Sequence, residues 1–315
     1  MLGFYLLLLV IFSFLLIKSS DILVSSLQRL ATTTHLGKFA LTSFVVALAT
    51  SLPELFVGVA AALEGKPDLS LGNVIGSNIA NLSLVIGGTA LVGGGMQIVG
   101  SFLKKDVFYT FLAGSAPLIL LLDNYLSRID GLILLAVYGW YVATVLHLKD
   151  HSHHFNGILK RLESRKSETA LSLLFLGVIL LIFSADMLVK VSYQLAKIFH
   201  VPLLLVGLFL VSIGTTLPEL SFGIKARRSN QVAMVFGNLL GSVVANSSLI
   251  LGIVALIAPI KIVYLQEYLL ATVFFVVIFA VFYFFVRSKR RLERWEGGLL
   301  FLLYLLFAAV EFLRH

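Results

Sequence analysis

A short motif occurs twice in this chain, each time inside a long apolar run. The first copy is Ala-Thr-Ser-Leu-Pro-Glu at residues 49–54, and the second is Gly-Thr-Thr-Leu-Pro-Glu at residues 214–219. A proline inside a helix removes a backbone hydrogen bond, and a charged side chain at the centre of a bilayer costs about 3 kcal/mol on insertion scales. Each copy therefore needs a reason, and the pair constrains the fold more than any other feature.

The apolar runs predict membrane spans. Hydrophobic residues make up 59% of the chain and charged residues only 13%, with a mean hydropathy of +1.01. Roughly 20 apolar residues cross a bilayer. Because the first run has no basic residue before it and no clear cleavage site, it is predicted to be a span and not a signal peptide. Ten spans are predicted, approximately at residues 2–24, 39–63, 69–99, 107–122, 131–148, 170–189, 202–224, 232–260, 264–286 and 297–313.

The basic residues indicate an orientation. When the loops are assigned alternately to two faces, one face receives seventeen Lys and Arg residues and the other receives six. The positive-inside rule makes the first face cytoplasmic and places both termini outside, as expected in a prokaryotic plasma membrane. The net charge of +8 lies in these short loops without interleaved aromatic residues, so nucleic-acid binding is not expected. The absence of cysteine excludes disulfides and thiolate metal sites.

The two motifs are part of an internal repeat. An offset of 165 takes Glu54 to Glu219, and it also superimposes Asp21 on Asp186 without a gap. Five spans per half is an odd number, so the halves enter the membrane from opposite sides, which is typical of transporters. The predicted fold is an all-α integral membrane protein with ten transmembrane helices in two inverted five-helix repeats. These are residues 1–148 and 170–315, joined by a cytoplasmic loop at 149–169, with the second and seventh helices broken at their prolines.

The polar residues of both halves predict a cation site. Hydroxyls lie three and four residues before each glutamate, on the same helix face, and the following helix of each half carries a polar stripe at a spacing of four. These are all hard oxygen ligands, which suit calcium, sodium or magnesium and not zinc or copper, and a formal charge of −2 matches one calcium or more than one sodium. The residues are Thr50, Ser51, Asn73, Ser77, Asn81, Thr215, Thr216, Asn238, Ser242 and Asn246.

Other polar residues receive weaker interpretations. Asp21 and Asp186 lack the sequence context of a membrane aspartyl protease, and they are expected near helix ends or on an ion access path. His151, His153 and His154 are expected in a solvated loop. Neither motif has a histidine placed to act as a base for a serine nucleophile. The sequence therefore predicts no enzyme and no cofactor.

The doubled motifs resemble the alpha repeats of the calcium/cation antiporter superfamily, and most closely its sodium/calcium exchanger branch. The resemblance includes Gly-Asn-Val-Ile-Gly-Ser-Asn-Ile-Ala-Asn at 72–81 and Gly-Asn-Leu-Leu-Gly-Ser-Val-Val-Ala-Asn at 237–246. It implies that Glu54 and Glu219 are the principal calcium ligands, alternating with sodium. It further implies that hydroxyl or carbonyl oxygens for calcium and sodium come from Thr50, Ser51, Ser77, Thr215, Thr216 and Ser242. The backbone of Ala47 and Ser212 would line outer sodium positions, and the amides of Asn81 and Asn246 would complete the centre of the site.

Three departures from the family pattern bear on coupling. Ala49 stands where the family usually has glycine, without loss of a ligand. Asn246 stands where many archaeal and potassium-dependent relatives have aspartate, which argues against potassium transport. Gly76 and Gly241 stand where proton-coupled exchangers usually carry glutamate. The short central loop also leaves no room for the regulatory domain of animal exchangers.

The expected function is therefore antiport of calcium against sodium by alternating access, in the direction of calcium export. The partners are these two ions and the lipid bilayer, and the oligomeric state is not predicted. A proton-coupled calcium exchanger of the same fold is the main alternative. A cation channel is less favoured, because channels more often arrange rings around an oligomer axis, whereas this chain duplicates its site within one polypeptide.

Overall fold

The protein is a bundle of long apolar helices. The structure, a computed structural model, describes residues 2–33, 47–97, 102–147, 165–289 and 291–314. Nearly all of these residues are helical. Within the described residues, seven helical segments are long and apolar enough to cross a membrane, and two shorter apolar helices accompany them.

The described residues of the first half form six α-helices and two short helices of other types. A wider π-helical turn, η1, joins α4 to α5, and this continuous helix ends at Gly94, which has a φ of +84°. A 3-10 turn, η2, ends α6. The bounds are α1 Leu2–Thr33, α3 Leu52–Leu63, α4 Pro67–Ala80, η1 Asn81–Val85, α5 Ile86–Gly93, α6 Phe102–Leu120, η2 Leu121–Asp123 and α7 Arg128–His147.

In the described residues of the second half, two π-helical turns occur. One of them, η3, leads into the helix of the second proline motif, and the other, η4, interrupts the following helix at the position equivalent to η1. The bounds are α9 Arg165–Phe199, α10 Leu203–Leu205, η3 Val206–Val211, α11 Ser212–Arg228, α12 Val232–Val244, η4 Ala245–Ile250, α13 Leu251–Ile257, α14 Leu265–Lys289 and α15 Arg294–Phe312.

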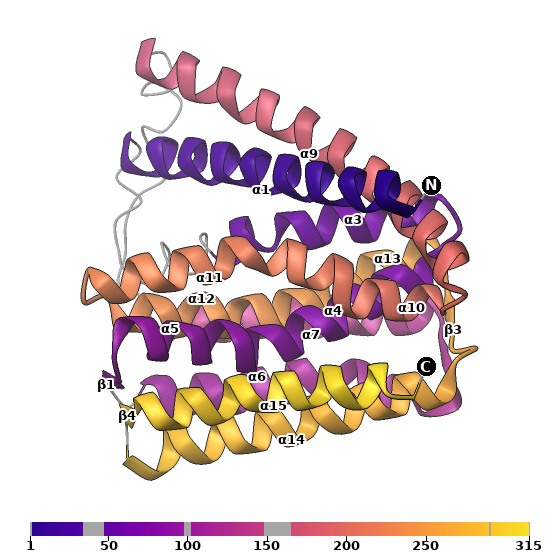
Figure 1. The fold of residues 1–315 in the computed structure, drawn as a ribbon. Coiled ribbons are helices and arrows are strands. Elements are labelled where there is room, and N and C mark those ends of the chain that lie inside the picture. Colours follow the sequence, from indigo (N-terminus) through magenta and orange to yellow (C-terminus); the bar gives the residue numbers. More distant parts are fainter. Residues whose placement is uncertain (1, 34–46, 98–101, 148–164, 290, 315) are drawn as a thin grey trace.

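Two short antiparallel ladders link the halves. Strand β1 (Met96–Gln97) pairs with β4 (Arg291–Leu292), and β2 (Tyr125–Leu126) pairs with β3 (Ile260–Lys261). The first ladder lies at the left end of the bundle in Figure 1, whereas β3 lies at the right end. Each ladder therefore joins one segment from each half. Strands of two residues carry no alternating pattern, and they were not predicted.

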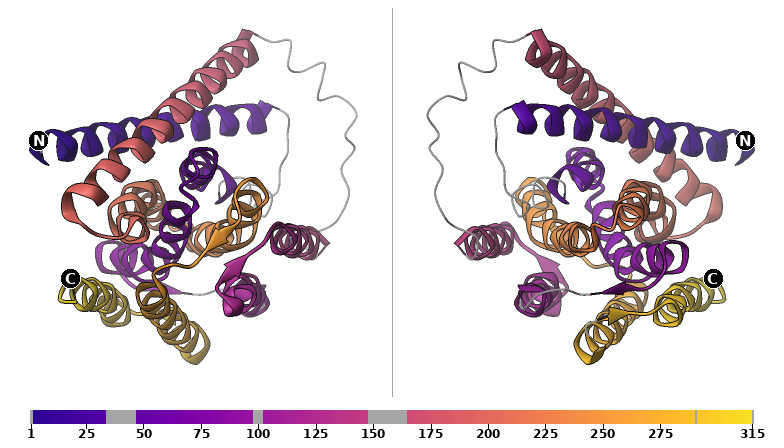
Figure 2. Two further views of the ribbon diagram at one scale, coloured as in Figure 1. Left: turned by 90° about the vertical axis from the view of Figure 1, so that its right-hand side faces the viewer. Right: turned by 90° about the vertical axis from the view of Figure 1, so that its left-hand side faces the viewer.

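The helices form three layers. In Figure 1, α1 and α9 lie on top, α14 and α15 lie at the bottom, and the helices of the two motifs lie between them, with both chain ends at the same side. Figure 2 shows the central helices end-on, with α1 and α9 crossing them obliquely. One apolar core packs α4, α5 and α12 against α14 and α15, and a second packs α1, α3 and α9 together.

Two of the helices, α1 and α9, are longer than a bilayer requires. With 32 and 35 residues, α1 and α9 exceed the predicted spans 2–24 and 170–189. At 1.5 Å per residue, α9 measures about 52 Å against a hydrocarbon thickness of about 30 Å, and tilting accommodates the excess. The oblique crossing of the two helices agrees with that explanation.

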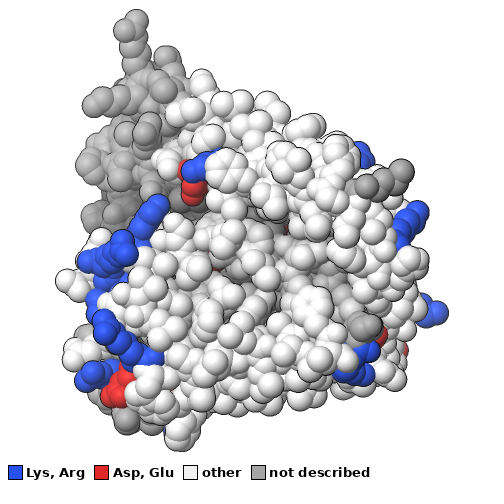
Figure 3. Space-filling view, viewed as in Figure 1, with Lys and Arg blue, Asp and Glu red and all other residues white. Residues whose placement is uncertain are grey.

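Charged side chains gather at the two ends of the bundle. Figure 3 shows Lys and Arg side chains clustered at the left and right edges of this face, with a belt between them that is almost free of charge. The exposed side chains of α1, α9, α14 and α15 are largely Leu, Ile, Val and Phe. This surface is that of an integral membrane protein.

Candidate cation site

The first proline motif lies where one helical segment ends and another begins. Ser51 has a φ of −85° and a ψ of 3°, and α3 starts at the next residue with Pro53 in its first turn. The N–H of Ser51 donates to the Ala47 carbonyl oxygen at 3.1 Å, and the N–H of Leu55 donates to Ser51 at 3.1 Å. Because proline has no N–H, the carbonyl of Ala49 lacks its usual helical donor.

The second proline motif differs from the first. Pro218 lies inside α11, which continues through it, so the break predicted at Pro218 is absent. At the first motif, α3 begins directly after Ser51, and Pro53 lies inside its first turn. A proline removes only one hydrogen bond and crowds one carbonyl, and a helix can absorb this by bending. The irregular backbone lies about two turns before Pro218, in η3, which ends directly before Ser212. π-helical turns of this kind are frequent at functional sites.

Both glutamates are completely enclosed. Glu54 and Glu219 have relative exposures of 0% and 1%. None of their four carboxylate oxygens accepts a hydrogen bond, and neither residue forms an ion pair, from any part of the chain that the structure describes. An ionised carboxylate in such a place is very costly unless a cation is bound. These four oxygens are therefore available ligands.

The carboxylates of the two halves meet at one place. The hydroxyls of Ser77 and Thr215, one from each half, lie beside Glu54 without the geometry of a hydrogen bond. The Thr50 hydroxyl lies beside Glu219 in the same way, and the two carboxylates are close enough to repel each other. Residues separated by more than 130 positions in the sequence thus surround one pair of like charges, which repel each other unless something positive or a proton separates them.

Two asparagines orient the threonine hydroxyls. Thr50 Oγ1 donates to Asn238 Oδ1 at 3.0 Å, and Thr215 Oγ1 donates to Asn73 Oδ1 at 3.2 Å. These bonds are equivalent in the two halves and cross between them. A hydroxyl that gives its hydrogen to an amide keeps its own lone pairs free for a cation. Two serines lie close by: Ser242 Oγ is 3.5 Å from Thr50 Oγ1, and Ser77 Oγ is 3.3 Å from Thr215 Oγ1.

The other predicted ligands are buried, but no contact shows them at the same point. The Ala47 carbonyl oxygen lies 3.2 Å from the hydroxyl oxygen of Thr50, and the Ser212 carbonyl accepts a hydrogen bond from the Thr216 hydroxyl at 2.9 Å. The buried hydroxyl of Ser51 has no partner among the described residues. The same holds for both polar atoms of Asn81 and for the side-chain oxygen of Asn246.

Close helix packing surrounds the site. A Cβ added to Gly76 would lie 2.2 Å from the carbonyl oxygen of Leu208, and one added to Gly72 would lie 2.1 Å from that of Leu204. Real Cβ atoms do not approach backbone oxygen so closely, so α4 lies this close to α10 and η3 only because these residues are glycine. A larger side chain such as glutamate does not fit at Gly76 while this packing persists.

A cavity of about 430 Å³ leads to the site from one end of the bundle. Its lining includes Thr50 and Pro218 of the two motifs, Lys225 in the last turn of α11 and Gln231 directly before α12. Asp21 also lines this cavity. Its lining extends to the end of the bundle where the basic last turn of α11 lies.

The two remaining groups of predicted polar residues have different outcomes. Asp186, the counterpart of Asp21, pairs with Lys190 at 2.8 Å instead of lining this cavity. The three central-loop histidines, at 151, 153 and 154, lie outside the described residues. Within the described ranges there is no cluster of three or more His, Asp or Glu residues. A cation at this site would therefore be held by two carboxylates and neutral oxygens.

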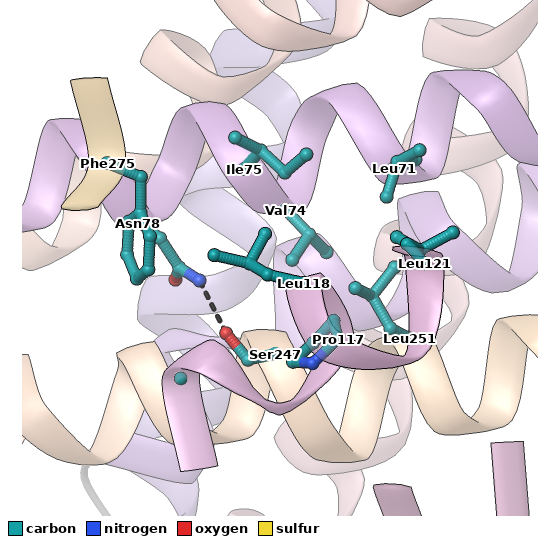
Figure 4. A pocket seen from close by; sticks show the side chains of 11 residues that line it. Leu71, Val74, Ile75, Asn78, Pro117, Leu118, Leu121, Ser247, Leu251 and Phe275 are labelled. Atoms are coloured by element: carbon teal, nitrogen blue, oxygen red, sulfur yellow. Dashed lines mark hydrogen bonds between the residues drawn. The ribbon is translucent and has the colours of Figure 1, made fainter. Parts of the chain in front are cut away.

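Sequence reasoning missed one polar pair beside the site. Asn78 Nδ2 donates to Ser247 Oγ at 2.7 Å, at the rim of a cavity of about 10 Å³ lined mainly by apolar residues (Figure 4). Asn78 also accepts a hydrogen bond from Asn246 Nδ2 at 3.2 Å. Its equivalent in the second half is Val243, so a search for symmetric polar residues passes over it. Its only sequence signal is an extra asparagine directly after Ser77.

Known proteins are similar to this chain in sequence and fold. A family model described as sodium/calcium exchanger protein matches residues 4–147 and 169–313. The chain is 31% identical to the inner membrane protein YrbG of Escherichia coli over 259 residues, which cover 80% of this chain and 79% of YrbG. It is 26% identical to the sodium/calcium exchanger MaX1 of Methanosarcina acetivorans over an alignment of 336 positions, covering 94% and 95% of the two chains.

Solved structures agree with these relatives. The sodium-calcium exchanger NCX_Mj, soaked with sodium and strontium, superimposes with a TM-score of 0.68 at 28% identity, covering 97% of this chain and 96% of that one. A second NCX_Mj structure gives a TM-score of 0.69 at 27% identity. The chain therefore belongs to the sodium/calcium exchanger protein family and is a prokaryotic-type member of the calcium/cation antiporter superfamily.

Proposed function

We propose that this protein exports calcium in exchange for sodium by alternating access around one site between Glu54 and Glu219. The observation that carries the proposal is the burial of both carboxylates with no partner in the described chain. Two such charges are compensated by one calcium or by more than one sodium ion. The names of MaX1 and NCX_Mj, both sodium/calcium exchangers, support this choice of ions.

The ligands that we propose come equally from the two halves. The carboxylates provide the charge, and the oriented hydroxyls of Thr50 and Thr215 provide neutral oxygens beside them. The hydroxyls or carbonyls of Ser51, Ser77, Thr216 and Ser242, the backbone of Ala47 and Ser212 and the amides of Asn81 and Asn246 complete the set. Oxygen ligands of mixed type in a flexible cage favour calcium and sodium over magnesium.

The coupling follows from electrostatics. The same two carboxylates cannot hold calcium and a full set of sodium ions together, so the ions compete. A site loaded with either set is neutral and can cross the apolar region, whereas an empty site with two charges resists crossing. This difference makes exchange obligatory. The close packing at Gly76, which leaves no room for an added glutamate, favours sodium over proton coupling.

We further propose that the fold is a ten-helix inverted repeat with its basic end in the cytoplasm. Three observations support the repeat. The π-helical turns η1 and η4 lie at equivalent positions, and each two-stranded ladder pairs one strand from each half. In each half, a threonine also donates a hydrogen bond to an asparagine of the other half. The excess of basic residues at one end supports the orientation. With that orientation, the cavity that reaches Thr50 opens toward the cytoplasm, and both termini lie outside.

Calcium uptake into proteoliposomes tests this function. Sodium, potassium and proton gradients are imposed one at a time, and uptake of radiolabelled calcium is followed. We expect saturable uptake only when sodium is loaded inside. Uptake driven by protons without sodium would replace the proposal by the proton-coupled alternative, and flux that needs no counter-ion would replace it by a channel. Normal uptake by the Glu54→Gln variant would show that the site is assigned incorrectly.

A further inference from the structure

Asn78 is a buried residue without a symmetric partner. It lies in α4 between Ser77 and Asn81 and is 3% exposed. Its side chain reaches η4 and contacts two successive residues there: its nitrogen donates to Ser247 Oγ, and its oxygen accepts from Asn246 Nδ2 at 3.2 Å. Figure 4 shows the first of these bonds. One amide of the first half thus holds the π-helical turn of the second half.

This contact fixes which end of the Asn246 amide is free. The nitrogen of Asn246 is held by Asn78, and its buried oxygen has no partner among the described residues. Asn81, the equivalent residue of the first half, has neither end held by a described residue. An amide oxygen binds a cation, whereas an amide N–H₂ group repels one. The orientation of Asn246 therefore decides whether it is a ligand.

We propose that Asn78 is a positioning residue that keeps the oxygen of Asn246 available to the transported cation. This inference rests on the proposed function, since it needs a cation at the site. It explains why a polar residue stands at position 78 where the other half has Val243. Partners that orient metal ligands from behind typically change metal affinity about tenfold or more when removed.

A double-mutant cycle in the full-length protein tests this role. Calcium binding to detergent-solubilised protein is measured for the wild type, Asn78→Val, Asn246→Ala and the double variant. We expect Asn78→Val to weaken binding about tenfold and to have almost no further effect in the Asn246→Ala background. In an Asn246→Asp background both side-chain atoms are oxygens, so the effect of Asn78→Val should also disappear.

The matched control is Ser248→Ala, which removes another buried polar group of η4 whose hydroxyl donates to the Ala113 carbonyl at 3.3 Å. It should leave calcium affinity unchanged. Equal weakening by Asn78→Val in every background would assign Asn78 a general structural role and overturn the proposal, as would no weakening at all. Failure of the wild type to bind calcium would instead count against the proposed function.

A second, independent observation concerns the two ends of the bundle. The cavity at the basic end is lined by Asp21, Ser25, Ser229 and Gln231. The offset of 165 takes these four residues to the opposite end of the bundle. Their counterparts are Asp186, Lys190, Glu64 and Lys66.

The four counterparts form a chain of ion pairs. Lys190 Nζ is 2.8 Å from Asp186 Oδ2 and 3.8 Å from Glu64 Oε1, and Lys66 forms an ion pair with Glu64. Glu64 caps the end of α3 and Lys66 precedes α4, so the chain ties α9 to the connection between these two helices. The basic end of the bundle therefore has a cavity, and the equivalent residues at the opposite end form ion pairs.

We infer that Glu64, Lys66, Asp186 and Lys190 form a latch that keeps the second end closed while the first is open. This inference also rests on the proposed alternating access. Opening the second end by the symmetric movement would separate α3 from α9, and Lys190 could not then bridge them. Because Ser25, Ser229 and Gln231 are uncharged, the same latch cannot form at the basic end. The two conformations are therefore stabilised differently in spite of the repeat.

The natural chain has no cysteine, which permits a direct test by single-cysteine labelling. Ser221 lines the open cavity, and Phe56 is its counterpart in the second core. Each is replaced by cysteine in separate proteoliposome samples, and labelling by a membrane-impermeant thiol reagent is timed from each side. We expect Lys190→Ala to raise the labelling rate at Phe56→Cys about fivefold, the scale of a partly exposed ion pair, and to lower it at Ser221→Cys.

Lys261→Ala is the matched control, because Lys261 lies in β3 at the same end of the bundle but outside the latch. It should change neither rate. Unchanged rates in Lys190→Ala would overturn the latch, and so would a rise at both positions, which indicates loosening of the whole fold. The labelling needs no transported ion, so absence of sodium-dependent calcium flux in the wild type would contradict the proposed function alone.

Discussion

The hydroxyl of Thr50 donates a hydrogen bond to the side-chain oxygen of Asn238, 3.0 Å away in the other half of the chain. Thr215 makes the equivalent bond to Asn73 at 3.2 Å. Each half thus supplies both a hydroxyl next to the carboxylates and the amide that orients the hydroxyl of the other half. Two helices that share ligands in this way cannot separate without disturbing the site, so binding and conformation are linked.

Replacing either threonine by valine should weaken calcium binding by a similar amount. Thr50→Val and Thr215→Val keep the side-chain shape but remove a ligand oxygen and leave an amide oxygen buried without its donor. An unsatisfied buried group of this kind costs about 1–3 kcal/mol, so we expect affinity losses of about 10-fold to 100-fold. Calorimetric titration with calcium measures this.

Thr110→Val is the control for that experiment. The Thr110 hydroxyl in α6 is buried and has no partner among the described residues, so its removal should leave calcium affinity unchanged and should not lower stability. A loss of affinity at only one of the two site threonines would contradict the equivalence of the halves.

Replacing either glutamate by glutamine should raise the thermal stability of the ion-free protein and abolish its stabilisation by calcium. Glu54→Gln and Glu219→Gln each remove a buried acid that must carry an uncompensated charge or take up a proton when no cation is bound, so both variants should melt at a higher temperature than the wild type in ion-free buffer. Calcium at 100 times its Kd should stabilise the wild type by about 2.7 kcal/mol and stabilise neither variant. Melting curves with and without calcium measure both effects. Equal calcium stabilisation of the variants would place the ion elsewhere.

Much of this site could be predicted from the sequence because its chemistry is local and doubled. The proline motifs identify the two glutamates, and a spacing of four identifies Asn73 and Ser77 on one helix face. The offset between the halves then predicts which residues are equivalent. No such rule applies to Asn78, whose counterpart is Val243, and its bonds to η4 depend on how the two halves pack.

Other features depend on energies too small for a sequence pattern to decide. Pro218 resembles Pro53, yet α11 continues through it while the first motif is interrupted at Ser51. The sequence also cannot tell which end of a symmetric repeat is open. In the structure that difference accompanies the ion pairs of Lys190, whose counterpart is Ser25.

Adding a methyl group at Gly76 should destabilise the protein. Gly76→Ala would place a Cβ 2.2 Å from the Leu208 carbonyl oxygen, so α4 must move away from η3, and the Ser77–Thr215 contact should lengthen. Overpacking of this kind costs about 1–3 kcal/mol, and calcium binding should weaken as well. Thermal unfolding and calcium titration measure the two effects.

Gly139→Ala is the matched control. Nothing lies within 4 Å of a Cβ at Gly139 in α7, so alanine should raise helix stability by about 1 kcal/mol without affecting calcium. If Gly76→Ala were as stable as the wild type, the close approach of α4 and η3 would not be required.

Adding a third carboxylate should change how the loaded site moves. In Asn246→Asp the residue that Asn78 contacts becomes an acid, and the formal charge of the site rises from −2 to −3. Calcium should bind more tightly, because one more charged oxygen faces it, but the calcium-loaded site keeps a net charge of −1. Since a charged site crosses the apolar region less readily, the maximal exchange rate should fall while the calcium concentration for half-maximal uptake decreases.

Lowering the pH, which neutralises the added acid, should restore the maximal exchange rate of Asn246→Asp. Initial rates of radiolabelled calcium uptake, measured against calcium concentration at two pH values, test all three effects. A maximal rate above that of the wild type at neutral pH would show that neutrality of the loaded site does not control its movement.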